Sequence, residues 1–184
     1  MDVAQEKPKS LKPLIALNLV LASVLLYILL FLFGQYEPVR EPVNKIPAFG
    51  MASAMHEGTF DNSVLTEDVF ILNVFASWCK PCEAEHPFLK QLAETHNIPV
   101  YGIALKDQED DLSAFLNRLG NPYRDIGLDN AGLMLPGLGI GGIPATFVAD
   151  SNHNIYAIVQ GPLSQGFVDD TILPAVDNIR NKAR

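Results

Sequence analysis

Both cysteines of the chain lie in one short segment, Trp78-Cys79-Lys80-Pro81-Cys82. This C-x-x-C pattern follows the apolar run Val69–Ala76, which places it at the junction between a predicted strand and a predicted helix. A thiol attacks as its thiolate, and the unpaired N–H groups and dipole of a helix N-terminus stabilise that negative charge. Cys79 would sit at this terminus and Cys82 one turn inside it. Cys82 could then resolve a mixed disulfide formed at Cys79, so the pattern predicts a dithiol-disulfide switch.

Three other uses of such a cysteine pair compete with this interpretation. A structural disulfide would close a very short loop, which removes little chain entropy and makes a poor cross-link. A zinc site needs about four ligands, whereas the chain has no second C-x-x-C and only 4 scattered histidines. Haem attachment requires a histidine directly after the second cysteine, where Glu83 stands. The structural disulfide remains the alternative to the redox switch.

The uncharged segment Leu14–Phe33 predicts a transmembrane helix, since at about 1.5 Å per residue it would span the roughly 30 Å hydrocarbon core. A cleaved signal peptide would have a shorter apolar region ending at small residues, and residues 31–36 offer no such site. Lysines 7, 9 and 12 precede the segment, so the positive-inside rule places the rest of the chain outside the cytoplasm. We therefore expect a single-pass bacterial inner-membrane protein with its C-terminal domain in the periplasm. Its expected parts are a cytoplasmic tail at 1–13, an anchor at 14–33, a linker at 34–47 and a folded domain at 48–184.

The chain is acidic, with a formal net charge of −8 at pH 7. This charge argues against nucleic acid or an anionic membrane surface as a partner of the folded part. Acidity alone selects no substrate.

Hydrophobic patterning after the linker predicts alternating strands and helices. Almost wholly apolar runs, such as Val69–Ala76, indicate strands buried on both faces. The expected elements are a strand at 69–76, a helix from Pro81 to about Thr95, a parallel strand at 98–105, a helix at 110–119 ended by Gly120, a short strand at 123–128, an antiparallel hairpin at 145–149 and 155–160, and a closing helix at 167–179 interrupted at Pro174. This order, with C-x-x-C at the first helix, is a thioredoxin-like α/β layout.

Residues 137–142 match the letters of the dinucleotide-binding pattern G-x-G-x-x-G. That pattern must leave a strand and open a helix, whereas this one leads into Pro144 and a strand. We therefore reject a nucleotide site and interpret the glycines as allowing the loop to approach the redox site closely.

Three segments together resemble the CcmG/DsbE family, the membrane-anchored thiol-disulfide interchange proteins of cytochrome c maturation. They are residues 73–86 (NVFASWCKPCEAEH), 119–123 (LGNPY) and 142–147 (GIPATF), and the N-terminal anchor fits as well. The resemblance implies a three-layer sandwich around a mixed central sheet. It also implies a redox-active disulfide, Cys79–Cys82, and no cofactor.

The resemblance further implies supporting residues around the two cysteines. Trp78 and Pro144 would shape a platform for substrate, with Pro144 a cis-proline packed against the disulfide; a trans Pro144 at the start of an edge strand is the alternative. Pro81 suits the first helical turn. Asn73 stands where ordinary thioredoxins carry a buried aspartate, so a base for Cys82 must come from elsewhere.

Glu85 is the nearest candidate for that base, and a solvated surface role is its alternative. His86 could serve instead, although an exposed histidine at this place is more often incidental. The chain also departs from the family pattern, because Gly141 and Ala145 stand where an aromatic residue and a glutamate are common.

The resemblance implies a periplasmic reductant of cytochrome c biogenesis. Its substrate would be the haem-binding C-x-x-C-H disulfide of apocytochrome c, or a maturation-complex thiol protein holding that segment, and a membrane thiol protein would donate electrons. Two alternatives stay open. One is a general extracytoplasmic disulfide oxidant or isomerase, and the other is a non-enzymatic tethered binding module with a structural disulfide.

Overall fold

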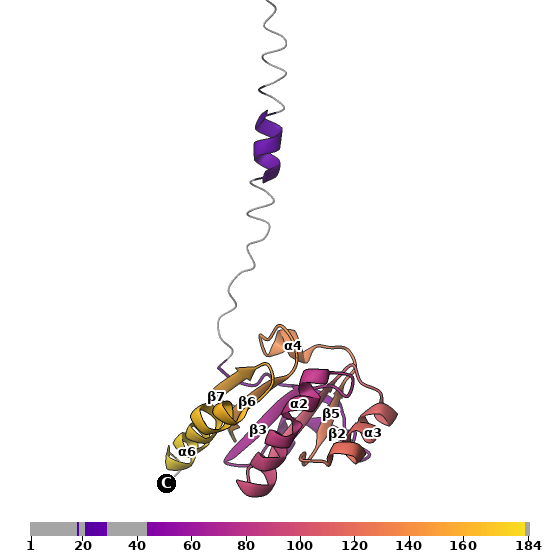
Figure 1. Cartoon of the computed structure of the whole chain (residues 1–184), viewed down its shortest axis with the longest axis vertical. Coiled ribbons are helices and arrows are strands. Elements are labelled where there is room, and N and C mark those ends of the chain that lie inside the picture. Colours follow the sequence, from indigo (N-terminus) through magenta and orange to yellow (C-terminus); the bar gives the residue numbers. More distant parts are fainter. Residues whose placement is uncertain (1–17, 19–20, 29–43, 183–184) are drawn as a thin grey trace, which may run out of the picture. The chain divides into compact units, whose positions relative to one another are not determined.

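The structure, a computed structural model, describes residues 18, 21–28 and 44–182 (Figure 1). The chain divides into two compact units, Met1–Arg40 and Glu41–Arg184. Residues 21–28 of the first unit are helical, and no helix among the described residues is both long and apolar enough to span a bilayer. The expected tail and most of the expected anchor and linker lie outside the described residues. The anchor therefore stays a prediction.

The second unit is built on a five-stranded mixed sheet with the strand order β5-β4-β3-β6-β7. The first three of these strands are parallel, β6 runs antiparallel to β3, and β7 runs antiparallel to β6. A separate antiparallel pair joins β1 to β2. The strand bounds are β1 Gly50–Ala52, β2 Thr59–Asp61, β3 Val69–Phe75, β4 Val100–Leu105, β5 Ile126–Asp129, β6 Ala145–Asp150 and β7 Ile155–Gln160.

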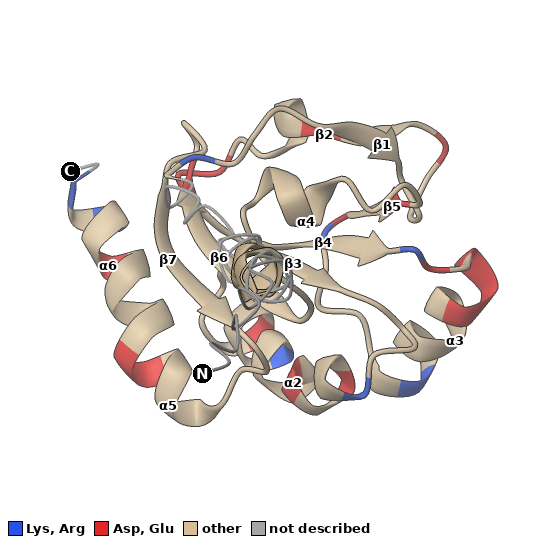
Figure 2. Ribbon diagram, turned by 90° about the horizontal axis from the view of Figure 1, so that it is seen from above, with Lys and Arg blue, Asp and Glu red and all other residues tan. Residues whose placement is uncertain are grey.

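Helices cover one face of the sheet more extensively than the other (Figure 2). Buried residues of α2, α3 and α6 share one apolar core with the sheet, and β2, α4 and the loop after α4 contribute to a second core on the opposite face. The helix bounds are α2 Lys80–Lys90, α3 Glu109–Leu119, α4 Met134–Gly137, α5 Gln165–Phe167 and α6 Leu173–Lys182. The expected thioredoxin-like fold, with a mixed central sheet, is confirmed.

The central strand β3 is buried along its whole length because it has a helix-bearing layer on each side. Val69, Ile71 and Phe75 belong to the core under α2, whereas Phe70, Leu72 and Val74 belong to the opposite core. Side chains alternate between the faces of a strand, so Asn73 shares the α2 face with the first set. It is the one polar residue of this strand.

The main sequence-based elements are confirmed, with shifted boundaries. β3 and β4 are parallel, and β6 and β7 form the antiparallel hairpin. β5 begins at Ile126, so Tyr123 lies in the loop before the strand rather than in it. The sequence did not predict β1, β2 or α4, since elements of three or four residues are too short to show a hydrophobic period.

Two of the predicted helices contain a proline and a π-helical turn. Pro87 lies inside α2, which passes into a π-helical turn at Gln91–Thr95, and Pro174 lies at the start of α6, which follows a second π-helical turn at Val168–Ile172. A proline has no N–H to donate to the carbonyl four residues back, so the regular ladder is interrupted near it. The predicted interruption at Pro174 is confirmed.

Candidate active site

Cys79 and Cys82 form a disulfide at the N-terminus of α2, with their Cα atoms 5.3 Å apart. Cys79 is the N-cap residue, and its sulfur accepts the backbone N–H of Cys82 at 3.3 Å. Pro81 stands in the first helical turn, as predicted, where its missing N–H leaves no bond unmade. After reduction, the N–H of Cys82 and the helix dipole would both face a thiolate on Cys79.

Charges beside the disulfide are paired. Glu83 lies in the first turn of α2, where hydrogen bonds from Arg118 (2.6 Å) and then Lys80 (3.1 Å) lower its pKa to about 2. The carboxylate is therefore neutralised by two cations next to the cysteines. This pairing reduces the repulsion that a nearby anion would exert on a Cys79 thiolate.

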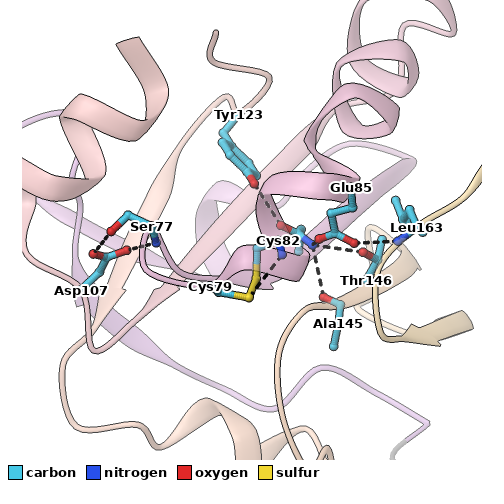
Figure 3. The surroundings of a disulfide bond; sticks show 10 residues. Ser77, Cys79, Cys82, Glu85, Asp107, Tyr123, Ala145, Thr146 and Leu163 are labelled. Atoms are coloured by element: carbon cyan, nitrogen blue, oxygen red, sulfur yellow. Dashed lines mark hydrogen bonds between the residues drawn. A yellow bond between two sulfur atoms is a disulfide. The ribbon is translucent and has the colours of Figure 1, made fainter. Parts of the chain in front are cut away.

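Trp78 is exposed, with 60% of its surface accessible. Its ring N–H donates to the backbone carbonyl of Lys106 at the end of β4, 3.2 Å away. The preceding residue, Ser77, is held by the buried carboxylate of Asp107, which accepts both its backbone N–H and its hydroxyl at 2.6 Å (Figure 3). Asp107 thus ties the segment before the cysteines to the end of β4.

Removal of that carboxylate should destabilise the fold without touching the thiols. We expect Asp107→Ala to lower the free energy of unfolding by about 1–3 kcal/mol, because it leaves the Ser77 N–H without its acceptor. Urea denaturation of the oxidised protein measures the change. The matched control, Asp177→Ala on the exposed side of α6, should change it by less than about 0.5 kcal/mol. Equal effects of the two substitutions would contradict the structural role of Asp107.

The Ile143–Pro144 peptide bond is cis, which confirms the isomer that the resemblance implied. Pro144 is buried, and its carbonyl accepts the N–H of Gly161 at 2.8 Å.

The glycines before Pro144 were expected to allow the loop to approach the redox site closely. This interpretation is wrong for two of them, because a Cβ atom at Gly141 or Gly142 would meet nothing within 4 Å. Close approach therefore does not require glycine there. Ala145 is fully buried in the core opposite α2, a place that suits a small apolar side chain.

A buried polar network lies beneath the first turns of α2 (Figure 3). The amide nitrogen of Asn73 donates to a carboxylate oxygen of Glu85 at 2.8 Å and to the hydroxyl of Thr146 at 3.0 Å. The amide oxygen of Asn73 accepts the phenol O–H of Tyr123 at 2.9 Å. The second carboxylate oxygen of Glu85 accepts the backbone N–H of Leu163 at 2.9 Å. Every polar atom of the Asn73 side chain is thus engaged.

Glu85 is inaccessible to solvent, which rules out the alternative of a solvated surface residue. Burial raises the pKa of Glu85 to about 7, and the hydrogen bonds from Leu163 and Asn73 oppose that rise in part. Residues three apart on a helix are neighbours, with about 5–6 Å between their Cβ atoms, so Glu85 lies one turn from Cys82 on the same face. A carboxyl group that titrates near neutrality can both accept and release a proton.

His86 is buried, which corrects the expectation of an exposed histidine. Its Nε2–H donates to the carbonyl of Gly120 at 2.8 Å, and its ring packs edge-on against Phe115 at 5.1 Å between centroids. Burial lowers the pKa of His86. Its other nitrogen, Nδ1, has no hydrogen-bond partner among the described residues. His86 therefore joins α2 to the end of α3, and the polar network contains Glu85 instead.

Sequence reasoning missed four members of the site, Asp107, Tyr123, Thr146 and Leu163. The sequence holds one signal for Thr146, because it is a polar residue in an apolar strand. The structure shows that it pairs directly with Asn73 across β3 and β6. Among the described residues, no group of histidines, cysteines and acidic side chains could hold a metal ion.

Comparison with known proteins places this geometry in a family. The redoxin family model matches residues 42–176. The chain belongs to the redoxin family. It is 31% identical to the thiol:disulfide interchange protein HelX of Rhodobacter capsulatus over 89% of this chain and 95% of that protein. It is 38% identical to the thiol:disulfide interchange protein CycY of Rhizobium leguminosarum bv. viciae, over 61% of this chain and 60% of CycY, which is less than two thirds of its length.

Solved redoxin-like structures agree with the fold. A secreted thiol-disulfide isomerase from Corynebacterium glutamicum superposes with a TM-score of 0.63 and 27% identity, over 77% of this chain and 96% of that one. The chain is also 34% identical to the thiol:disulfide interchange protein DsbE of Escherichia coli (strain K12), over 75% of each protein. This redoxin is accordingly a DsbE-type thiol-disulfide oxidoreductase that works through a redox-active disulfide without a further cofactor.

Proposed function

We propose that this redoxin is a periplasmic reductant of cytochrome c biogenesis. It would reduce the haem-binding C-x-x-C-H disulfide of apocytochrome c, or of a partner protein that holds that segment. The observation that carries the proposal is the disulfide at the N-terminus of α2, whose first cysteine caps the helix, in a chain of the DsbE type.

The two cysteines take successive roles in the proposed reaction. The thiolate of Cys79 attacks a sulfur of the substrate disulfide, forming a mixed disulfide and releasing one substrate thiolate, which takes a proton from water. Cys82 then loses its proton and attacks Cys79. The second substrate thiol leaves, and the Cys79–Cys82 disulfide forms. The substrate gains two electrons, and this protein loses two.

Glu85 is the proposed acceptor of the Cys82 proton. Its position one turn along α2 and its pKa of about 7 suit that transfer. Asn73 holds the carboxyl group in place. Trp78 and Pro144 form the proposed platform for the substrate peptide, since the exposed indole lies next to Cys79 in the chain and the cis peptide precedes β6.

The location and the electron source complete the proposal. The segment at residues 14–33 would anchor the protein in the bacterial inner membrane, residues 1–13 would lie in the cytoplasm, residues 34–47 would form a linker, and residues 48–184 would form the periplasmic domain. Because the periplasm is kept oxidising, electrons must be supplied through the membrane. A membrane thiol protein is the proposed donor.

The reduction potential of the Cys79–Cys82 pair tests the direction of the reaction. Titration of the full chain against a glutathione or dithiol buffer should give a midpoint at or below roughly −200 mV, close to glutaredoxin or thioredoxin. A midpoint near −120 mV, as in strong periplasmic oxidants, would assign the protein to disulfide formation instead.

A double substitution tests the non-enzymatic alternative, a tethered binding module. Cells that carry only the Cys79→Ser, Cys82→Ser variant should fail to assemble cytochrome c, since the variant cannot transfer electrons. Normal assembly with this variant would show that the disulfide is only structural. The amount of variant protein in the membrane, measured by immunoblot, controls for its loss through instability.

A further inference from the structure

Tyr123 is buried and lies over the row of residues that runs across the sheet at Asn73. In this row Gly102 of β4 pairs with Asn73, and Asn73 pairs with Thr146 of β6. A Cβ atom at Gly102 would come within 3.1 Å of the Tyr123 ring, so the glycine leaves the space that the ring fills. The ring also stacks on Phe75, with 4.7 Å between centroids. Tyr123 is therefore fixed with its hydroxyl at the amide of Asn73.

The amide of Asn73 has two possible orientations, and they differ in what they present to Glu85. In the observed orientation the NH₂ group faces the carboxyl group of Glu85, and the oxygen accepts from Tyr123. In the reversed orientation an amide oxygen would face Glu85. An oxygen there repels a carboxylate and can accept a hydrogen bond only from the protonated acid.

We infer that Tyr123 is a positioning residue that holds the Asn73 amide in the orientation that stabilises ionised Glu85. The inference rests on the proposed role of Glu85 as proton acceptor for Cys82. The phenol O–H donates to the amide oxygen, so a reversal of the amide would break that bond and turn the NH₂ group away from the carboxylate. Tyr123 thus acts on Glu85 through Asn73.

The surroundings of Glu85 offer few other groups that could control its charge. No ion pair among the described residues involves Glu85. The carboxyl group of Glu85 accepts hydrogen bonds from the neutral amide of Asn73 in β3 and from the backbone N–H of Leu163 in the loop after β7. The titratable groups nearby are Tyr123, Cys82 after reduction, and His86, which is turned toward Gly120. The hydrogen bonds to Glu85 are consequently the main means of stabilising its carboxylate.

The titration of Glu85 in the oxidised full chain tests this inference. Carbon-13 NMR of labelled glutamate, assigned with the Glu85→Gln variant, follows the carboxyl group directly. Tyr123→Phe removes only the hydroxyl and should shift the titration of Glu85 upward by about one pH unit, since it removes the hydrogen bond that keeps the NH₂ group of Asn73 turned toward the carboxylate. Tyr101→Phe is the matched control, because that buried phenol bonds Glu67 instead and should leave the titration unchanged.

A second variant tests the path through Asn73 and guards against misfolding of the first. Asn73→Leu alone should raise the titration midpoint of Glu85, because it removes the amide NH₂ group that donates to the carboxylate. Addition of Tyr123→Phe to this variant should cause no further shift. The inference would be overturned if Tyr123→Phe left the titration midpoint of Glu85 unchanged. It would also be overturned if Tyr123→Phe shifted that midpoint equally in the wild-type protein and in the Asn73→Leu variant.

The reaction itself separates this inference from the proposed function. The rate at which Cys82 resolves a mixed disulfide, measured against pH in stopped flow, should shift together with the NMR midpoint in Tyr123→Phe. If the midpoint moves while the rate profile stays in place, Tyr123 positions the network but Glu85 is not the proton acceptor. If neither moves, the positioning role itself is wrong.

Discussion

Cys79→Ser should reduce the rate of disulfide exchange by at least about a thousand-fold, to the level of the reaction without protein. The reason is that Cys79 supplies the attacking thiolate at the N-terminus of α2, and a serine hydroxyl is not ionised near neutral pH. Reduction of a model C-x-x-C-H peptide by the pre-reduced protein, followed by mass spectrometry, measures the rate.

Substitution of the second cysteine is the control, because it should trap the mixed disulfide that Cys79→Ser cannot form. Cys82→Ser keeps the attacking thiol but removes the thiol that resolves the mixed disulfide. We therefore expect a covalent adduct between Cys79 and the peptide that dithiothreitol releases. If this variant yields no adduct although its Cys79 reacts with an alkylating reagent, the assigned order of the two cysteines is wrong.

Glu85→Gln should alter how the stability of the oxidised protein depends on pH. Because burial raises the pKa of Glu85 from 4.5 to about 7, the folded protein binds a proton between these values that the unfolded chain has released. The contribution of Glu85 to the free energy of unfolding must then fall as the pH rises through this window. The shift corresponds to about 3 kcal/mol between pH 4 and pH 8.

The substitution removes this titration. The free energy of unfolding of Glu85→Gln, relative to that of the wild type, should therefore increase by about 3 kcal/mol from pH 4 to pH 8. Urea denaturation at the two pH values measures it. Glu57→Gln, in an exposed loop, is the control for the loss of a carboxylate and should differ by less than about 0.5 kcal/mol at each pH. A constant difference for Glu85→Gln would show that Glu85 does not titrate in this window.

The central strands could be predicted because their burial leaves a strong local pattern. β3 and β4 are apolar along nearly their whole length, since each has a core on both faces, and the helix between them forces a parallel pairing. β1 and β2 carry no comparable pattern, because three residues include too few alternations to distinguish a strand from a loop. The pairing of β1 with β2 depends on contacts that the sequence does not display.

The polar network shows a different reason for the failure of prediction. Asn73 was recognisable as the polar residue of an apolar strand, but its partners lie 12, 50 and 73 residues away, at Glu85, Tyr123 and Thr146. Helical spacing places Glu85 near Cys82 and says nothing about which element covers that face. The expectation that His86 was exposed failed for the same reason, since α3 and the Gly120 loop cover it.

The sequence by itself determined the thiol chemistry of this redoxin, because that chemistry is local. Two cysteines three positions apart at a helix N-terminus lie within disulfide reach whatever else the chain does, and the helix supplies the electrostatic field that favours a thiolate. Only the tertiary structure decided how the proton of Cys82 could be managed. The burial of Glu85 and the orientation of Asn73 arise where β3, β6, α2 and the Tyr123 loop meet, and desolvation depends on all of the layers that exclude water from one place.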